Sequence, residues 1–189
     1  MNRNIRILTG SAMLVAIGVV LSLFRIPISM ITEITLTSLP IALGGYLFGP
    51  AAGAAIGALI DVGGFFIAPK GAFFPGFTVS TALIGLIYSL FLYRVWWSPE
   101  KEGRRFLRTV PGGLFTRIAV SHLLKTLLIS LFLNCFWLAA YYGMPFAAVL
   151  VGSIPKEAVN FPVEVLLIYS VIRLAERLHL FMDRPHKKS

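Results

Sequence analysis

Residues 36–67 read LTSLPIALGGYLFGPAAGAAIGALIDVGGFFI, and their one charged side chain is Asp61. The Phe48-Gly49-Pro50 sequence divides this stretch into two apolar segments, because glycine and proline together mark a turn. The second segment is rich in alanine and glycine, which let the backbones of neighbouring helices approach closely. The stretch therefore predicts two membrane-embedded helices, over residues 36–48 and 51–67, joined by a tight turn.

The rest of the chain has the same apolar character. Of its 189 residues, 57% are hydrophobic and 13% are charged, whereas soluble domains have about 45–50% and about 25%. We therefore predict an all-α integral membrane protein with six transmembrane helices in a single domain of residues 1–189. The apolar start resembles a signal peptide, but no small-residue cleavage site follows, so we expect a retained helix. The predicted helices span about residues 5–24, 36–48, 51–67, 76–97, 114–142 and 147–174, before a basic tail at 175–189.

The basic residues predict the orientation. If the chain crosses the membrane six times, twelve lysines and arginines lie on one side, in the two ends of the chain and in the loop after the fourth helix. The loops on the opposite side contain only Arg25 and Lys70. The positive-inside rule then predicts that both termini are cytoplasmic and that loops 25–35, 68–75 and 142–147 are outside. The first of these loops alternates and contains Pro27, which favours extended backbone. We expect a multi-pass protein of the bacterial cell membrane, in contact with lipid and with no nucleic-acid partner.

Several kinds of chemistry have no support in the sequence. The lone cysteine, Cys135, lies in an apolar run and offers neither a disulfide framework nor a cysteine-based metal site. There is no glycine-rich phosphate loop, no HExxH and no GxSxG motif. We therefore expect no ATP hydrolysis by this chain, no metal or cofactor, and no enzymatic activity.

Three ionisable residues lie inside predicted membrane helices, where charge is costly and usually has a function. Asp61, Lys125 and Glu164 fall at a similar mid-membrane depth. One interpretation is that Asp61 or Glu164 pairs with Lys125 and holds helices together; the alternative is that one of them reaches a ligand or relays a conformational change. Arg117 and His122 lie nearer the cytoplasmic boundary, where we expect their side chains to extend to the lipid headgroups.

A second group of residues lies nearer the outer surface. Aromatic side chains at this depth are typical of an interfacial belt. A belt does not explain amides, hydroxyls and a lysine at the same depth, and these indicate a site for a flat, hydrogen-bonding ligand with an anionic part. The group comprises Phe74, Phe77, Thr78 and Thr81 from the fourth helix, Asn134, Trp137, Tyr141 and Tyr142 from the fifth, and Lys156, Glu157 and Asn160 from the sixth.

Several stretches together resemble a known family. They are Arg25-Ile-Pro27, residues 39–54, Asp61, the sequence FFPGFTVS at 73–80 with ALIGLIY at 82–88, and Lys156 followed by FPVE at 161–164. The chain resembles the folate-specific S components of energy-coupling factor (ECF) vitamin transporters, most strongly in the second to fourth helices. One departure concerns residues 152–154, which read Gly-Ser-Ile where the family often has a basic residue.

The resemblance implies a mechanism. An S component captures its vitamin at the outer face, associates with a transmembrane coupling subunit and two cytoplasmic ATPases, and reorients to release the vitamin inside. Ala12 and Ala16 match the small residues that dock onto the coupling subunit, although their spacing also suits ordinary helix packing. The substrate-binding residues we expect are Arg25, Asp61, Lys70, Phe74, Phe77, Thr78, Asn134, Trp137, Tyr141, Lys156 and Asn160.

Three alternatives remain open at this point. The chain could be an S component for another vitamin, such as riboflavin, thiamine or a pyridoxine-like compound. It could be a small membrane enzyme that acts on lipid headgroups through Asp61, His122 and Glu164, although its acidic residues are scattered singly. It could also be an assembly subunit that binds no ligand.

Overall fold

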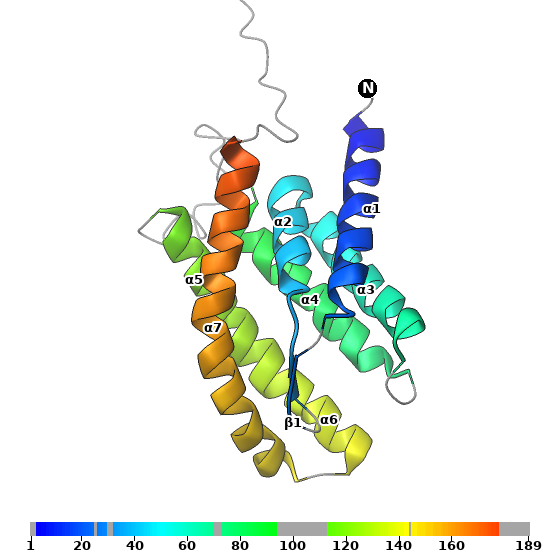
Figure 1. The fold of residues 1–189 in the computed structure, drawn as a ribbon, viewed down its shortest axis with the longest axis vertical. Coiled ribbons are helices and arrows are strands. Elements are labelled where there is room, and N and C mark those ends of the chain that lie inside the picture. Colours follow the sequence, from blue (N-terminus) through cyan, green and yellow to red (C-terminus); the bar gives the residue numbers. More distant parts are fainter. Residues whose placement is uncertain are drawn as a thin grey trace, which may run out of the picture.

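A computed structural model describes residues 3–24, 26–29, 32–69, 73–93, 113–143 and 145–177 (Figure 1). Within these residues the chain forms six helical segments and one hairpin. The elements are α1 (Arg3–Leu21), β1 (Ile26–Ser29), β2 (Thr32–Ile34), α2 (Ser38–Phe48), α3 (Pro50–Ile67), α4 (Pro75–Leu92), α5 (Leu114–Lys125), η2 (Thr126–Leu133), α6 (Asn134–Tyr142) and α7 (Phe146–Arg177).

The six helices predicted from the sequence are confirmed, with differences in their bounds. α4 ends at Leu92, and residues 94–97 of the predicted fourth helix lie outside the described residues. α5, η2 and α6 follow one another without interruption and correspond to the predicted helix at 114–142; the middle part, η2, is a π-helix. α1 ends at Leu21 rather than near residue 24, and α7 extends to Arg177 rather than to about 174. Five of the six segments are long and apolar enough to cross a membrane, whereas α2 has 11 residues and is shorter than a bilayer requires.

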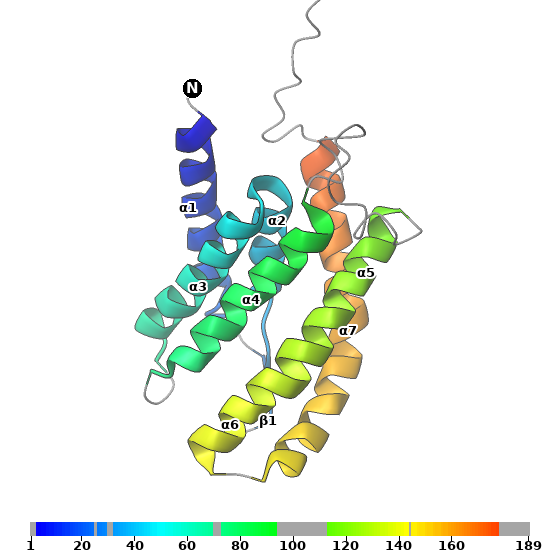
Figure 2. The same ribbon diagram turned by 180° about the vertical axis from the view of Figure 1, so that it is seen from behind.

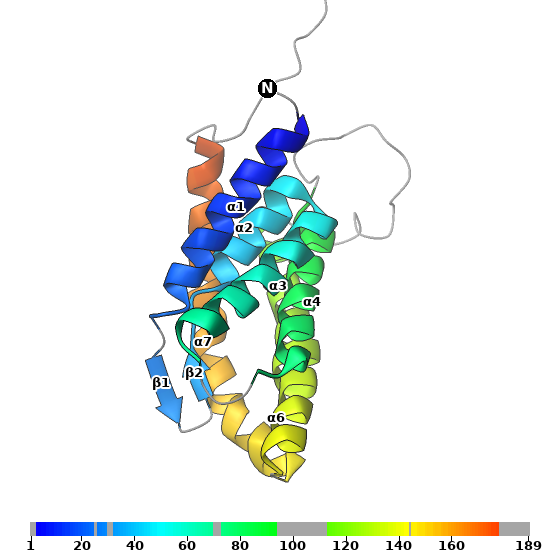
Figure 3. The same cartoon turned by 90° about the vertical axis from the view of Figure 1, so that its right-hand side faces the viewer.

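The loop after α1 is extended, as its alternation and Pro27 predict. β1 and β2 pair antiparallel, with Ile26 opposite Ile34 and a register shift between Pro27 and Ser29. The predicted helical membrane fold is thus confirmed, with one short hairpin added in a loop. β2 contacts α7, and Figure 3 shows the hairpin in the half of the bundle that also holds α6 and the start of α4.

Small residues bring α3 and α4 together along much of their length. A Cβ at Gly85 would meet the backbone of Gly53, and a Cβ at Gly57 would meet the backbone of Thr81. Only a residue without a side chain allows two helix backbones to lie this close. Figure 2 shows α3, α4 and α5 side by side, and both neighbouring pairs are in contact.

The core lies where α2, α4, α5 and α7 meet. Its largest fully buried apolar side chains come from these four helices and from α3, and Tyr88 lies among them with no exposed surface. The start of α1 and the end of α7 lie at the same end of the molecule (Figure 1). α6 and the start of α7 lie at the opposite end, joined through Gly143, whose φ of 66° is in the left-handed region that glycine adopts readily. The members of the core are Leu14, Ile41, Ala42, Tyr46, Ile56, Ile60, Ile84, Tyr88, Leu92, Ile118, Ile129, Val165, Ile168 and Ile172.

Candidate functional site

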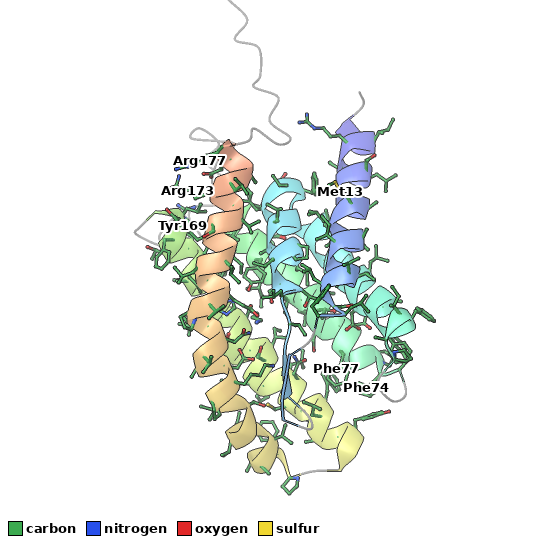
Figure 4. All side chains as sticks on the ribbon, viewed as in Figure 1. Met13, Phe74, Phe77, Tyr169, Arg173 and Arg177 are labelled. Atoms are coloured by element: carbon green, nitrogen blue, oxygen red, sulfur yellow. The ribbon has the colours of Figure 1, made fainter. Side chains whose placement is uncertain are left out.

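Four predicted aromatic residues form one cluster in the half of the bundle away from the start of α1 and the end of α7. Phe74 lies at its centre, with its ring centroid 5.7 Å from that of Phe77, 5.4 Å from that of Trp137 and 5.6 Å from that of Tyr141. Pro75 begins α4 directly after Phe74, which positions a proline in the first turn, where its missing N–H costs little. Figure 4 shows Phe74 and Phe77 at the opposite end from Arg173 and Arg177.

Two polar atoms beside this cluster stand out. Among the described residues, five buried side-chain polar atoms have no hydrogen-bond partner, and two of them, the indole N–H of Trp137 and Oδ1 of Asn134, belong to predicted site residues. The other three are the Ser11 and Ser80 hydroxyls and His122 Nε2. An unsatisfied buried polar atom costs roughly 1–3 kcal/mol, so such atoms are rare unless something else satisfies them. Both residues were predicted site residues, and their orphaned donor and acceptor are what a polar, flat ligand would complete.

Asp61 and Thr78 form a link between α3 and α4 in this half of the molecule. The Thr78 hydroxyl donates to Asp61 Oδ2 at 2.7 Å. The two residues were predicted separately as site residues, and the fold brings them into direct contact. Of the two pairings with Lys125 that the sequence allowed, through Asp61 or through Glu164, the structure shows the one with Glu164.

One face of α7 carries a row of polar side chains inside the bundle. Glu157, Asn160 and Glu164 follow at i, i+3 and i+7, and each is at most 5% exposed. Glu157 accepts from the Thr126 hydroxyl at 3.5 Å and lies 3.5 Å from the Lys156 ammonium group. Thr126 is the first residue of η2, so the π-helical segment begins at the level of this polar face.

Glu164 is the centre of a buried network. Lys125 Nζ lies 3.3 Å from Glu164 Oε2, and His122 Nδ1 lies 3.5 Å from the same oxygen. Asn160 donates from Nδ2 to Glu164 Oε1 at 2.6 Å. The Tyr88 hydroxyl lies 2.7 Å from His122 Nδ1 and brings α4 into the network. Buried charge of this kind is stable only when paired and hydrogen-bonded, and here both carboxylate oxygens have partners.

The network corrects the prediction made for His122 and includes one residue, Tyr88, that was not predicted as part of the site. His122 was expected to extend to lipid headgroups, but it has no exposed surface and lies between Tyr88 and Phe161. A side chain on the face of α5 that is turned toward the bundle axis stays inside, whatever its distance from the membrane boundary. Tyr88 was not among the predicted site residues; the sequence places it only at the end of the stretch 82–88 that resembles the family.

The remaining predicted residues have different positions. Ala12 and Ala16 are exposed on the outside of α1, one turn apart. Arg25 and Lys70 lie outside the described residues. The structure thus brings Phe74, Phe77, Trp137 and Tyr141 together, joins Asp61 to Thr78, and places Lys156 and Asn160 on α7 in contact with neighbouring carboxylates.

The fold and this interior define a class: a polytopic α-helical membrane protein with polar and aromatic side chains inside one half of its bundle. The sequence matches the family described as "ECF transporter, substrate-specific component" over residues 6–172, and the chain belongs to that family.

Individual relatives agree with the family. The "Folate transporter FolT" of Clostridium novyi (strain NT) is 29% identical over 178 residues, which cover 94% of each chain. A solved structure described as FolT bound with folic acid is 31% identical, with a TM-score of 0.69 over 84% of this chain and 87% of that one. A second structure, of the S component of a bacterial ECF transporter, is 23% identical and has a TM-score of 0.68 over 96% of this chain and 100% of the other, which supports the fold.

Proposed function

We propose that this chain is the folate-binding subunit of an ECF-type vitamin transporter. The observation that carries the proposal is the pair of orphaned polar atoms, Trp137 Nε1 and Asn134 Oδ1, buried beside the Phe74 cluster. A pterin ring offers faces for stacking and edges with several hydrogen-bonding atoms, so it would satisfy both features at once. The similarity to a folate transporter and to a structure with bound folic acid supports the same ligand.

The polar residues divide between the two ends of such a ligand. The ring would lie among Phe74, Phe77, Trp137 and Tyr141, with Asn134, Asn160, Thr78 and Asp61 at its hydrogen-bonding edge. Lys156 is the described cation nearest the start of α7, and its side chain is 23% exposed, which suits contact with a glutamate carboxylate. Arg25 and Lys70, from the two loops predicted to be outside, are proposed for the same carboxylates or for closing the site.

Membership of the family supports a proposal for the transport cycle. We propose that both termini are cytoplasmic in the bacterial cell membrane and that folate enters from outside. A transmembrane coupling subunit and two ATPase subunits would supply the energy, because this chain has no phosphate-binding loop. Ala12 and Ala16 are proposed to face the coupling subunit, since exposed small residues permit close helix contact.

The test is ligand identification followed by a matched pair of variants. Mass spectrometry of the purified protein and equilibrium dialysis against folic acid, riboflavin, thiamine and pyridoxine identify the vitamin; high affinity for one of the other three, and none for folic acid, contradicts the proposal. Trp137→Phe keeps an aromatic ring and removes the donor. We expect about tenfold weaker folic acid binding with unchanged thermal stability. Phe132→Leu, at a side chain of the same helical segment that is 64% exposed, serves as the control and is expected to leave affinity unchanged.

A further inference from the structure

The hydrogen bond between Asn160 and Glu164 determines which atom Asn160 presents to the rest of the site. An asparagine amide has a donor end and an acceptor end, and the two are distinguished by their partners rather than by their shape. The neighbour at 2.6 Å is Glu164 Oε1. A carboxylate accepts hydrogen bonds and does not donate them, so the Asn160 atom facing it is the amide nitrogen.

The carboxylate is itself held in place by another helix. Its second oxygen, Oε2, lies 3.3 Å from the Lys125 ammonium group of α5 and 3.5 Å from His122. The Glu164 side chain is 2% exposed, so no competing orientation toward solvent is open to it. Glu164 therefore keeps its acceptor role, and Asn160 keeps its amide nitrogen turned toward it.

The amide oxygen of Asn160 then faces the other way. Glu164 lies one turn further along α7, so the nitrogen points toward the end of the helix, and the oxygen on the same amide carbon points away from Glu164. Figure 1 shows that the start of α7 lies beside α6, the helix that carries Asn134 and Trp137. The oxygen is therefore the Asn160 side-chain atom left to accept a hydrogen bond from a ligand in the candidate site.

We propose that Glu164 is a positioning residue that makes Asn160 an acceptor, and that the matching ligand group is the exocyclic amino group of an aminopyrimidine ring. This inference rests on the proposed folate-binding function. The amino group extends beyond the ring and carries two N–H donors, so it is the donor best able to reach an acceptor at the edge of the site. Lys125 acts indirectly, because it fixes the position of the Glu164 carboxylate.

The substitution Glu164→Gln tests the inference because it reverses the Asn160 amide. The introduced glutamine would offer its oxygen to Lys125 and its nitrogen to Asn160. Asn160 must then turn its own oxygen toward that nitrogen, and its amide nitrogen toward the ligand. The amide nitrogen of Asn160 and the amino group of the ligand, which are both donors, would then face each other without a hydrogen bond. A site whose polar group has lost its partner in this way discriminates against the ligand. We expect folic acid to bind about tenfold more weakly.

A second variant restores the acceptor. When Asn160→Asp is combined with Glu164→Gln, the introduced glutamine donates to one oxygen of the introduced aspartate, and the other aspartate oxygen faces the ligand. The net charge is that of the wild type, and Lys125 still has an oxygen opposite it. We expect this exchange of the two side-chain types to return folic acid affinity to within about threefold of the wild type, since the lost hydrogen bond is restored.

The ligands are folic acid and its analogue in which a methyl group replaces the 2-amino group, measured by equilibrium dialysis on the full chain in detergent. We expect the wild type to prefer folic acid by about tenfold or more, Glu164→Gln to lose the preference, and the exchanged variant to recover it. Glu176→Gln makes the same change on α7 near the opposite end, where Tyr46 donates to Glu176 at 2.9 Å, and is expected to leave the preference unchanged.

The outcomes distinguish a role of Glu164 in ligand recognition from a purely structural role. Equal wild-type affinity for the two ligands overturns the inference without any variant. If Glu164→Gln weakens both ligands by the same factor, and the exchanged variant shows no preference, then Glu164 has only a structural role. If Glu164→Gln does not fold, the preference of the exchanged variant decides in its place. A wild type that binds no folic acid at all is a different result, and it overturns the proposed function.

Discussion

Lys125 and Glu164 are charged residues that the fold has removed from both water and lipid. Lys125 is 5% exposed and Glu164 is 1% exposed, and their charged groups lie 3.3 Å apart between α5 and α7. Such a pair contributes little net stability compared with apolar side chains of similar size, because both ions lose their hydration. Removing one partner is a different matter, since the other is left buried without compensation.

Lys125→Met is therefore expected to destabilise the protein by roughly 3–5 kcal/mol. Combining it with Glu164→Met is expected to cost clearly less than the sum of the two single substitutions, because the second change removes the uncompensated charge. Thermal unfolding of the wild type, both single variants and the double variant in the same detergent measures this coupling. Effects that simply add would mean that the two charges do not stabilise each other.

The sequence could predict that these charges matter, but not which of them meet. Asp61 and Glu164 lie at similar depths and have the same chemistry, so depth alone left Lys125 with two equivalent partners. The choice depends on the rotation of α3, α5 and α7 about their axes, which comes from packing over the whole bundle. Asp61 accepts from Thr78 of α4. The same reason explains His122, whose buried position depends on which side of α5 faces the core.

At the scale of elements, the contact between α3 and α4 is the most extensive in the described part of the molecule. Alanine and glycine in residues 51–64 predicted close helix packing, and the structure places this surface against α4. Helix positions were predictable because apolar runs, Phe48-Gly49-Pro50 and Pro75 mark their ends. The π-helical segment at Thr126–Leu133 was not, because no residue in an apolar run distinguishes it from ordinary α-helix.

Gly85→Ala tests how closely α3 and α4 are packed. The added methyl group would meet the backbone of Gly53, which cannot move aside as a flexible side chain could. We expect a loss of about 1–3 kcal/mol, as for other overpacked positions. Gly152→Ala is the matched control, because a Cβ there has no neighbour within 4 Å and alanine favours a helix. Similar melting temperatures for the two variants would show that the helices can separate at little cost.

At the scale of the whole molecule, the outside of α1 is the surface we propose for the coupling subunit. Ala16→Trp places a large ring on this exposed face, and Ala158→Trp places the same ring on an exposed position of α7. Because neither side chain is buried, both variants are expected to fold and to bind folic acid as the wild type does. Only Ala16→Trp is expected to reduce co-purification with the coupling subunit, by about tenfold or more, because a large ring prevents the close contact that small residues permit. Equal co-purification would place docking elsewhere.

The orientation in the membrane is a property of the entire chain, because it depends on how the basic residues divide between the two sides. The described ends of the chain, at α1 and α7, lie at one end of the bundle (Figure 1), so a single experiment on the loops fixes the sidedness of both. With Cys135 replaced by alanine, Pro69→Cys and Pro145→Cys are expected to react with a membrane-impermeant maleimide on intact cells. Lys101→Cys is expected to react only after permeabilisation, because the positive-inside rule places its loop in the cytoplasm. The reverse pattern would invert the proposed topology and move the Phe74 cluster to the cytoplasmic side, where it could not capture an external vitamin.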